Sequence, residues 1–225
     1  MNRLNLHSPV FITGIERSGS SIIGRIVNLS GAFAGNITDM YENIQIKKLL
    51  DSYYELLGVD KRGQYPLPDA GKLIIPTNWE QKVEGVVSTE MRMDRPWMLK
   101  GSRLCQIWPV WHYAFPNAKW IIVRRRPGDI IDSCLKTGYM TAFKEKEGWL
   151  GWVHTHEKIF VEMIKAGLNC KQIWPERMVD GNYEQLYEVL DWIGLPKKEG
   201  LTNFINPLLW GGKKGELYGS KSNGK

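Results

Sequence analysis

The sequence predicts a three-layer α/β fold in which a central parallel sheet is flanked by helices, and three observations support this prediction. Residues 10–13 form a short apolar run rich in β-branched residues, followed by a glycine-containing loop and then by apolar residues at helical spacing. Residues 119–123 read Lys-Trp-Ile-Ile-Val, and such a run is typical of a strand buried on both faces of a parallel sheet. The chain has 225 residues, enough for one such domain with a large core.

The other elements follow from apolar spacing and from residues that begin or end helices. The first helix, after the glycine loop, should end near Gly31, and residues 97–100 form a short strand. Further helices are predicted over residues 41–57, 107–115 and 149–166, from Pro127 onward, and in the segment that ends at Ile193. Residues 60–76 are rich in glycine and proline, which indicates a long exposed connection that acts as a flap or binding edge. Residues 80–93 show no clear pattern.

Composition narrows the class of protein. The net charge of +6 suits an anionic ligand, although it does not by itself separate a small anion from nucleic acid. Three widely spaced cysteines give neither a disulfide framework nor a pair of metal ligands. No apolar run is as long as a membrane span, and the N-terminus lacks a signal-peptide pattern. We therefore expect a cytoplasmic protein with one domain over residues 1–215 and a flexible tail over residues 216–225.

The glycine loop, residues 14–21, has the features of an anion-binding site. The backbone N–H groups of such a loop and of the following helical turn point at one spot, and the helix dipole adds partial positive charge there. Gly14 and Gly19 allow positive φ angles and a close backbone approach to a ligand. Their spacing matches a P-loop, but the lysine expected next is Ser20, and the loop's cation is instead Arg17. A plain turn between strand and helix is the alternative.

A second anion site is predicted where the strand over residues 119–123 ends. Arg125 lies at its carboxyl end, and Ser133 follows about two helical turns later. Ligands of open α/β sheets bind beyond the carboxyl ends of the strands, so an arginine fork and a hydroxyl could share a phosphate here. For Arg124 and Arg126 we expect only solvation of the loop or ion pairs with acidic residues.

These two stretches together resemble the PAPS-dependent sulfotransferases, where PAPS is 3′-phosphoadenosine 5′-phosphosulfate. The first, Gly-Ile-Glu-Arg-Ser-Gly-Ser-Ser from Gly14 to Ser21, is similar to that family's 5′-phosphosulfate loop. The second, from Arg125 through Pro127 and Asp129 to Ser133, is similar to its 3′-phosphate motif, Arg-x-Pro-x-Asp-x-x-x-Ser. The segment Asn-Tyr-Glu-Gln-Leu from residue 182 resembles the family's Tyr-Glu-Asp-Leu segment. The resemblance extends from about residue 9 to residue 196.

The resemblance implies the donor PAPS, the product PAP, and roles for particular residues. The loop residues that would bind the phosphosulfate are Arg17, Ser18, Gly19, Ser20 and Ser21. Arg125 and Ser133 would hold the 3′-phosphate, and Tyr183 would lie near the adenine. Lys213 and Lys214 loosely resemble a basic loop that closes over the 3′-phosphate in some members. Negative charge that builds on the leaving phosphate would be stabilised by Arg17 and the loop, and no metal is required.

The sequence offers more than one candidate for the group that removes the acceptor's proton. Cytosolic members of the family place a histidine in a Lys-x-His segment, and here that segment reads Lys100-Gly-Ser102. Tyrosylprotein and carbohydrate-type members, which this chain resembles more, use a glutamate; Glu42 is the first candidate and Asp39 the second, both at the start of the predicted second helix. Lys100 either holds the sulfuryl group or is a solvated strand end. The four histidines, His7, His112, His154 and His156, are expected at the surface or in packing.

Two other functions stay open at this point. A P-loop nucleotide kinase with a degenerate loop is disfavoured by Ser20, and a non-catalytic nucleotide- or RNA-binding module remains because the histidine is missing. Under the leading hypothesis, a hydroxyl or amine acceptor is bound by residues 32–76 and 137–170, and nucleic acid is not expected as a partner. The sequence identifies neither the acceptor nor the oligomeric state.

Overall fold

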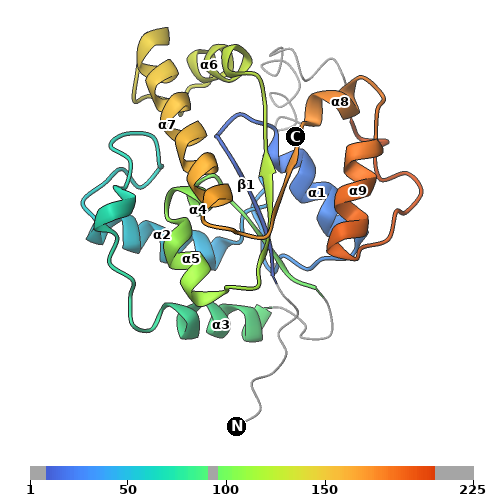
Figure 1. The fold of residues 1–225 in the computed structure, drawn as a ribbon, viewed down its shortest axis with the longest axis horizontal. Helices are drawn as coiled ribbons and strands as arrows, with labels where there is room; N and C mark the ends of the chain where they lie inside the picture. The colour runs from blue at the N-terminus through green and yellow to red at the C-terminus, as the bar shows by residue number, and fades with distance from the viewer. Residues whose placement is uncertain (1–8, 91–95, 206–225) are drawn as a thin grey trace, which may run out of the picture.

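The computed structural model describes residues 9–90 and 96–205, and its centre is a parallel sheet (Figure 1). The strands are β1 (Val10–Gly14), β2 (Met98–Lys100), β3 (Lys119–Val123) and β4 (Cys170–Ile173), in the spatial order β2-β1-β3-β4. Strand β1 pairs with β3 along its whole length, from Val10 opposite Lys119 to Gly14 opposite Val123. The predicted strands and their parallel arrangement are confirmed.

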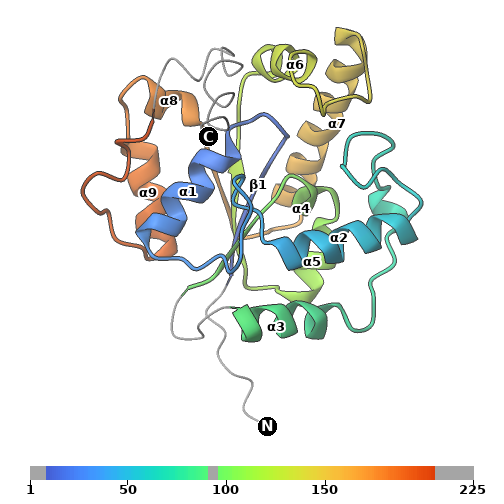
Figure 2. The same cartoon turned by 180° about the vertical axis from the view of Figure 1, so that it is seen from behind.

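Helices connect these strands and cover both faces of the sheet. Their bounds are α1 (Ser20–Ser30), α2 (Ile44–Leu56), α3 (Trp79–Glu90), α4 (Arg103–Gln106), α5 (Trp108–Ala114), α6 (Pro127–Leu135), α7 (Lys146–Lys165), α8 (Pro175–Val179) and α9 (Glu184–Ile193), with a 3-10 turn, η1, at Ala70–Lys72. Helices α1 and α9 lie on one side of the sheet and α2, α5 and α7 on the other (Figures 1 and 2). None of the described helices is long and apolar enough to cross a bilayer.

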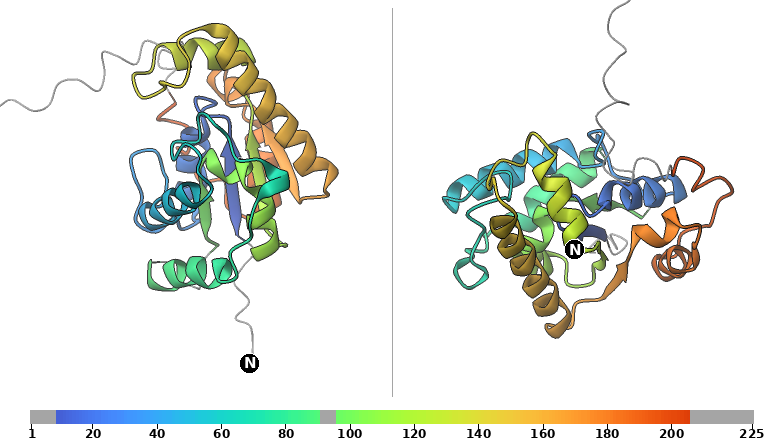
Figure 3. Two further views of the ribbon diagram at one scale, coloured as in Figure 1. Left: turned by 90° about the vertical axis from the view of Figure 1, so that its left-hand side faces the viewer. Right: turned by 90° about the horizontal axis from the view of Figure 1, so that it is seen from above.

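Two apolar clusters form because successive side chains of a strand point to opposite faces. Val10 and Ile12 of β1 join the cluster beneath α1 and α9. Phe11, between them, joins the larger cluster on the other face, where its ring contacts four aromatic rings at centroid distances of 4.8–6.1 Å. The molecule therefore has the predicted three layers, which the right-hand view of Figure 3 shows from above.

The strand order determines where a ligand can bind. The chain moves from β1 to β2 on one side and then crosses to β3 on the other side of β1. Because all four strands are parallel, the loops after Gly14, Lys100, Val123 and Ile173 leave from the same edge of the sheet. The crevice of an open α/β sheet lies where the strand order reverses, here on either side of β1.

Several boundaries differ from the sequence prediction. The second helix begins at Ile44 rather than at residue 41, because the side chain of Asn43 caps it by accepting a hydrogen bond from Ile46 N at 2.9 Å. Tyr41, with φ of +62°, is not helical, so the prediction that Asp39 and Glu42 start this helix is wrong; they lie in the preceding loop. Helices α3, α4 and α8 (Pro175–Val179) and the edge strand β4 had not been predicted.

The connection over residues 60–76 is long, as predicted, but part of it is not exposed. Gly63 and Gln64 are buried, and Gln64 is only 1% exposed. The Gln64 side chain donates to Tyr139 O at 2.9 Å and accepts from the backbone N–H groups of Thr141 and Ala142. This connection is thus fastened to the segment after α6.

Candidate active site

The glycine loop after β1 turns tightly into α1. Ser18 N donates to Ile15 O at 3.0 Å, and Gly19 has the left-handed φ of +91° that favours glycine. Gly14 does not use the positive φ that glycine allows; a Cβ there would lie 2.6 Å from Val123 O, so glycine is needed for close packing on β3. The other residue of this loop with a positive φ is Arg17, at +71°. This conformation costs a non-glycine residue about 1 kcal/mol or more.

The N-terminus of α1 is open to an anion. No side chain caps this helix, so its first N–H groups are available to a ligand. The hydroxyl of Ser18 is buried and has no hydrogen-bond partner among the described residues. A buried hydroxyl without a partner is costly, and an oxyanion in the loop would satisfy it. The loop therefore fits the predicted anion-binding role better than that of a plain turn.

The two predicted anion sites lie against each other. Arg17 Nε donates to Ser133 Oγ at 2.9 Å, which joins the loop after β1 to helix α6. A guanidinium nitrogen of Arg125 donates to Arg17 O at 2.8 Å. Burial lowers the pKa of Arg125 from its ordinary value, and the nearby carboxylates of Asp129 and Glu176 oppose this shift. Residues more than 100 positions apart in sequence thus form one cationic centre.

The flanking arginines behave as expected for residues outside the site. Arg124 pairs with Glu157 and lies over the rings of Phe160 and Trp174. Arg126 is exposed, at the start of α6.

Lys100 and Glu42 form an ion pair at the end of β2. Their Nζ–Oε1 distance is 3.2 Å, and the side chain of Lys100 is only 7% exposed. Lys100 is therefore not a solvated strand end, which was one of its two predicted roles. Helix α1 packs closely against Lys100 at Gly24, where an added Cβ would lie 3.4 Å from Lys100 Cγ. Asp39, the second candidate base, is exposed.

Glu16 is a residue of this site that the sequence did not single out. Its Oε1 lies 3.3 Å from Ser102 Oγ, and its Oε2 is buried without a hydrogen-bond partner among the described residues. Burial raises the pKa of Glu16 to about 7, repulsion from Glu42 adds to the shift, and the hydrogen bond from Ser102 opposes it. The only sequence signal was an acidic side chain inside a loop otherwise suited to anions.

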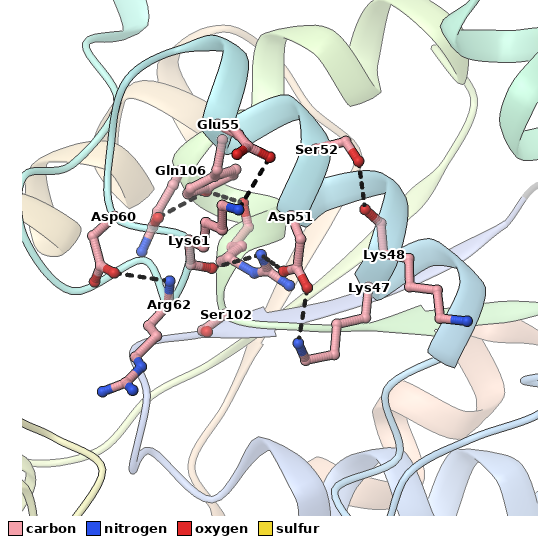
Figure 4. A network of polar contacts seen from close by, with 12 residues as sticks. Lys47, Lys48, Asp51, Ser52, Glu55, Asp60, Lys61, Arg62, Ser102 and Gln106 are labelled. Atoms are coloured by element: carbon pink, nitrogen blue, oxygen red, sulfur yellow. Dashed lines mark hydrogen bonds and ion pairs between the residues drawn. The ribbon is translucent and has the colours of Figure 1, made fainter.

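These groups border a cavity of about 310 Å³ between the loop after β1, α2 and the connection that follows α2. The residues that line it are polar or charged, with both signs of charge present: Glu16, Glu42, Lys47, Asp51, Lys61, Arg62, Gln64, Ser102, Arg103 and Tyr139. Figure 4 shows Lys47 and Lys61 directed toward Asp51 and Glu55 of α2, at 3.1 and 3.0 Å. Tyr139 also accepts a hydrogen bond from Arg17 at 3.1 Å, so the cavity adjoins the cationic centre.

The remaining predicted binding residues have different surroundings. Ser20 is buried at the start of α1, and the Ser21 hydroxyl lies 3.4 Å from Met40 O. Tyr183 directly precedes α9 and packs against the apolar cluster beneath α1 and α9. His7, Lys213, Lys214 and the tail over residues 216–225 lie outside the described residues.

His154 is exposed at the surface and His156 is fully buried in the packed interior, and these are the two settings predicted for the histidines. Its Nδ1 lies 2.8 Å from Trp152 O and its Nε2 lies 3.0 Å from Gln106 Nε2. Burial lowers the pKa of His156 to about 4, so the ring is neutral at pH 7. Within the described residues, no group of three or more His, Cys, Asp or Glu side chains could hold a metal ion.

Comparisons with known proteins identify the fold. No protein-family model and no curated protein matches the sequence. Among solved structures, the chain is similar to the sulfotransferase domain of the Synechococcus PCC 7002 olefin synthase, with a TM-score of 0.56 and 16% identity over 93% of this chain and 84% of that one. It is also similar to the sulfotransferase STF9 from Mycobacterium avium, with a TM-score of 0.53 and 12% identity over 88% of this chain and 66% of that one. The sulfotransferase STF1 from Mycobacterium tuberculosis is similar as well, with a TM-score of 0.50 and 12% identity over 93% of this chain and 74% of that one. The chain therefore has the fold of the sulfotransferases.

Proposed function

We propose that this chain is a sulfotransferase that moves a sulfuryl group from PAPS to a hydroxyl or amine acceptor. The observation that carries the proposal is the junction of the two anion-binding segments, through the hydrogen bonds of Arg17 with Ser133 and of Arg125 with Arg17 O. A nucleotide with a phosphate group at each of two ribose positions needs two such segments close together. The sulfotransferase fold agrees with this function.

The described residues suit such a donor. The uncapped N-terminus of α1 and the hydroxyls of Ser18, Ser20 and Ser21 would receive its 5′-phosphosulfate group. Arg125 and Ser133 would hold its 3′-phosphate, since guanidinium groups bind phosphate through paired hydrogen bonds. Tyr183 is assigned to the adenine from sequence resemblance alone. When bound, the donor supplies an electrophilic sulfur and a phosphate leaving group.

The cationic side chains of the site would stabilise the negative charge of the donor during transfer. Arg17, already fixed by Ser133 and Tyr139, is placed to stabilise the negative charge that develops beside the loop. Lys100, held in place by Glu42, would neutralise the sulfuryl oxygens on the β2 side. The reaction then depends on fixed positive groups and on positioning rather than on covalent chemistry by the protein.

The acceptor would occupy the polar cavity. Most of its lining comes from residues 42–64 and from Tyr139, which belong to the two segments expected to bind the acceptor, and Glu16, Ser102 and Arg103 complete it. Charged groups of both signs favour a small polar acceptor over an apolar one. A carboxylate in this cavity would take the acceptor's proton, and Glu42 is the candidate from the sequence.

Transfer of radioactive sulfate from labelled PAPS to a panel of alcohols, phenols and amines tests this function. We expect transfer by the wild type and a turnover number about 100-fold lower for Arg17→Ala, the usual loss when one preorganised donor is removed. Arg126→Ala, which changes an exposed neighbouring arginine, should match the wild type and serves as the control. Phosphoryl transfer from ATP–Mg²⁺ would favour a kinase instead, and donor binding without transfer would favour a non-catalytic module.

A further inference from the structure

We propose that Glu16, rather than Glu42, takes the proton from the acceptor. This inference rests on the proposed function. It assigns a catalytic role to a residue inside the anion-binding loop itself, one position before Arg17.

The position of Glu16 suits this role. Because the loop after β1 would hold the phosphosulfate, any side chain of that loop that faces the cavity is next to the transferred group. Glu16 lines the cavity together with Ser102 and Arg103. One of its oxygens lies 3.3 Å from Ser102 Oγ, and the other has no hydrogen-bond partner among the described residues. That second oxygen is the lone buried carboxylate oxygen without a partner in the described part of the chain.

Glu42 is less suited to the same task. One of its oxygens is already 3.2 Å from the ammonium group of Lys100, which is itself buried. Proton transfer to this carboxylate would leave the Lys100 charge buried without its partner, which is costly. We therefore assign Glu42 the role of positioning Lys100.

The charged surroundings tune Glu16 for proton transfer. The charged or titratable groups that interact with Glu16 come from four elements and one loop: Tyr54 of α2, Lys100 of β2, Arg103 of α4, Cys134 of α6 and Glu42 of the loop before α2. Burial and Glu42 raise the pKa of Glu16 to about 7, against the effects of Ser102, Lys100 and Arg103. A general base works best when its pKa is close to the working pH.

With Glu16 as the base, two bonds break and two form during sulfuryl transfer. The acceptor's O–H or N–H bond breaks and its proton goes to the carboxylate of Glu16. The acceptor oxygen or nitrogen forms a new bond to sulfur, and the bond between sulfur and the bridging oxygen of the phosphosulfate breaks. The electron pair of that bond leaves with the 3′,5′-bisphosphate.

The test uses water as the acceptor, so that no specific acceptor has to be known. Release of radioactive sulfate from labelled PAPS is followed from pH 5 to pH 9 in the wild type, Glu16→Gln, Ser102→Ala and Glu42→Gln. We expect the wild-type rate to rise with pH and level off above about 7, because the base must be deprotonated. Glu16→Gln should lose at least about 100-fold in rate and lose this rise with pH.

The other two variants identify the group that titrates. Ser102→Ala removes a hydrogen bond that lowers the pKa of Glu16, so the rise should move to higher pH. Glu42→Gln removes a repelling charge, so the rise should move to lower pH. A readout without turnover is the ¹³C NMR titration of glutamate-labelled protein, in which one carboxyl signal should titrate near pH 7 and be absent from Glu16→Gln.

Different failures point to different conclusions. A wild-type rate and pH profile in Glu16→Gln would overturn this inference and leave the sulfotransferase function intact. A rate that falls as pH rises through 7 would also overturn it, because Glu16 would then act as an acid. Absence of 3′,5′-bisphosphate binding, or of any sulfate release or transfer by the wild type, would instead refute the proposed function and this inference with it.

Discussion

Burial, rather than a bond to a partner, dominates the protonation of Glu16. Its largest influence is the loss of water around the carboxyl, and repulsion from Glu42 comes second. The folded-state pKa of about 7 lies above the ordinary value of 4.5, so the folded protein binds the proton more tightly than the unfolded chain. The contribution of Glu16 to stability is therefore fully present below pH 4.5 and is lost as pH rises through 7.

This linkage predicts the effect of Glu16→Gln on stability. A glutamine cannot ionise, so between pH 4.5 and pH 8 the variant should gain up to about 3 kcal/mol of unfolding free energy relative to the wild type. Urea unfolding at several pH values measures this gain. Glu188→Gln, which changes an exposed carboxylate on α9, is the control and should follow the wild type at every pH. If Glu16→Gln did so too, the Glu16 carboxyl would not be titrating near neutral pH.

The residues of the cationic centre could be predicted from the sequence, whereas the contact of Glu16 with Ser102 at the cavity could not. Arg17, Arg125 and Ser133 belong to motifs whose spacing points to anions. Glu16 and Ser102 contact each other only because β1 and β2 are neighbours in the sheet, and they are 86 positions apart. Such a contact leaves no local pattern.

At the scale of elements, the connection after α2 is held in place by two buried glutamines. The side chain of Gln64 forms hydrogen bonds with the backbone of residues 139–142. Gln106 of α4 donates to Gly63 O at 2.8 Å and to the Nε2 of His156, and it accepts from the hydroxyl of Tyr54. These bonds fix the wall of the proposed acceptor cavity against α4 and α7.

Gln64→Ala should loosen this wall. The change leaves two backbone N–H groups and one carbonyl of residues 139–142 without their partner, at a cost of about 1–3 kcal/mol. Hydrogen exchange should become faster at residues 141 and 142 in this variant. Lys72→Ala, in the exposed turn η1 of the same connection, should leave that exchange unchanged. Equal exchange in both variants would show that Gln64 does not fasten the connection.

The sequence predicted the elements with strong apolar periodicity and missed those that depend on tertiary contacts. Strands β1 and β3 are buried along nearly their whole length and were predicted within a residue of their observed ends. Strand β4 buries only Ile173 fully, and α3 buries three of its twelve residues, so their apolar patterns were too weak to recognise. The start of α2 was misplaced because the cap by Asn43 outweighed the apolar spacing around it.

At the scale of the whole molecule, Phe11 joins the central strand to the larger core. Its ring lies among the rings of Trp120 of β3, Trp111 of α5, Phe115 directly after α5 and Trp97 directly before β2. Burial of aromatic rings in such an arrangement stabilises the fold by more than the buried area alone accounts for, because edge-to-face pairs of rings also attract each other.

Phe11→Ala should lower the unfolding free energy by about 3–5 kcal/mol, through lost burial and the cavity that remains. Equilibrium unfolding in urea measures the loss. The control is Tyr113→Ala, since that ring is 70% exposed and its removal should cost little. A loss below about 1 kcal/mol for Phe11→Ala would contradict the central place of this ring in the core.

The most direct test of the proposed function is calorimetric titration with adenosine 3′,5′-bisphosphate and adenosine 5′-monophosphate, with ATP–Mg²⁺ as a control. If Arg125 and Ser133 hold a 3′-phosphate beside the loop of Arg17, the wild type should bind the bisphosphate at least about tenfold more tightly than the monophosphate, since hydrogen bonds to a charged phosphate contribute about 1.5–3 kcal/mol. Arg125→Ala should remove this preference, and Arg126→Ala should keep it. Equal affinity for the two nucleotides in the wild type, or a preference for ATP–Mg²⁺, would contradict the assignment of this site to PAPS.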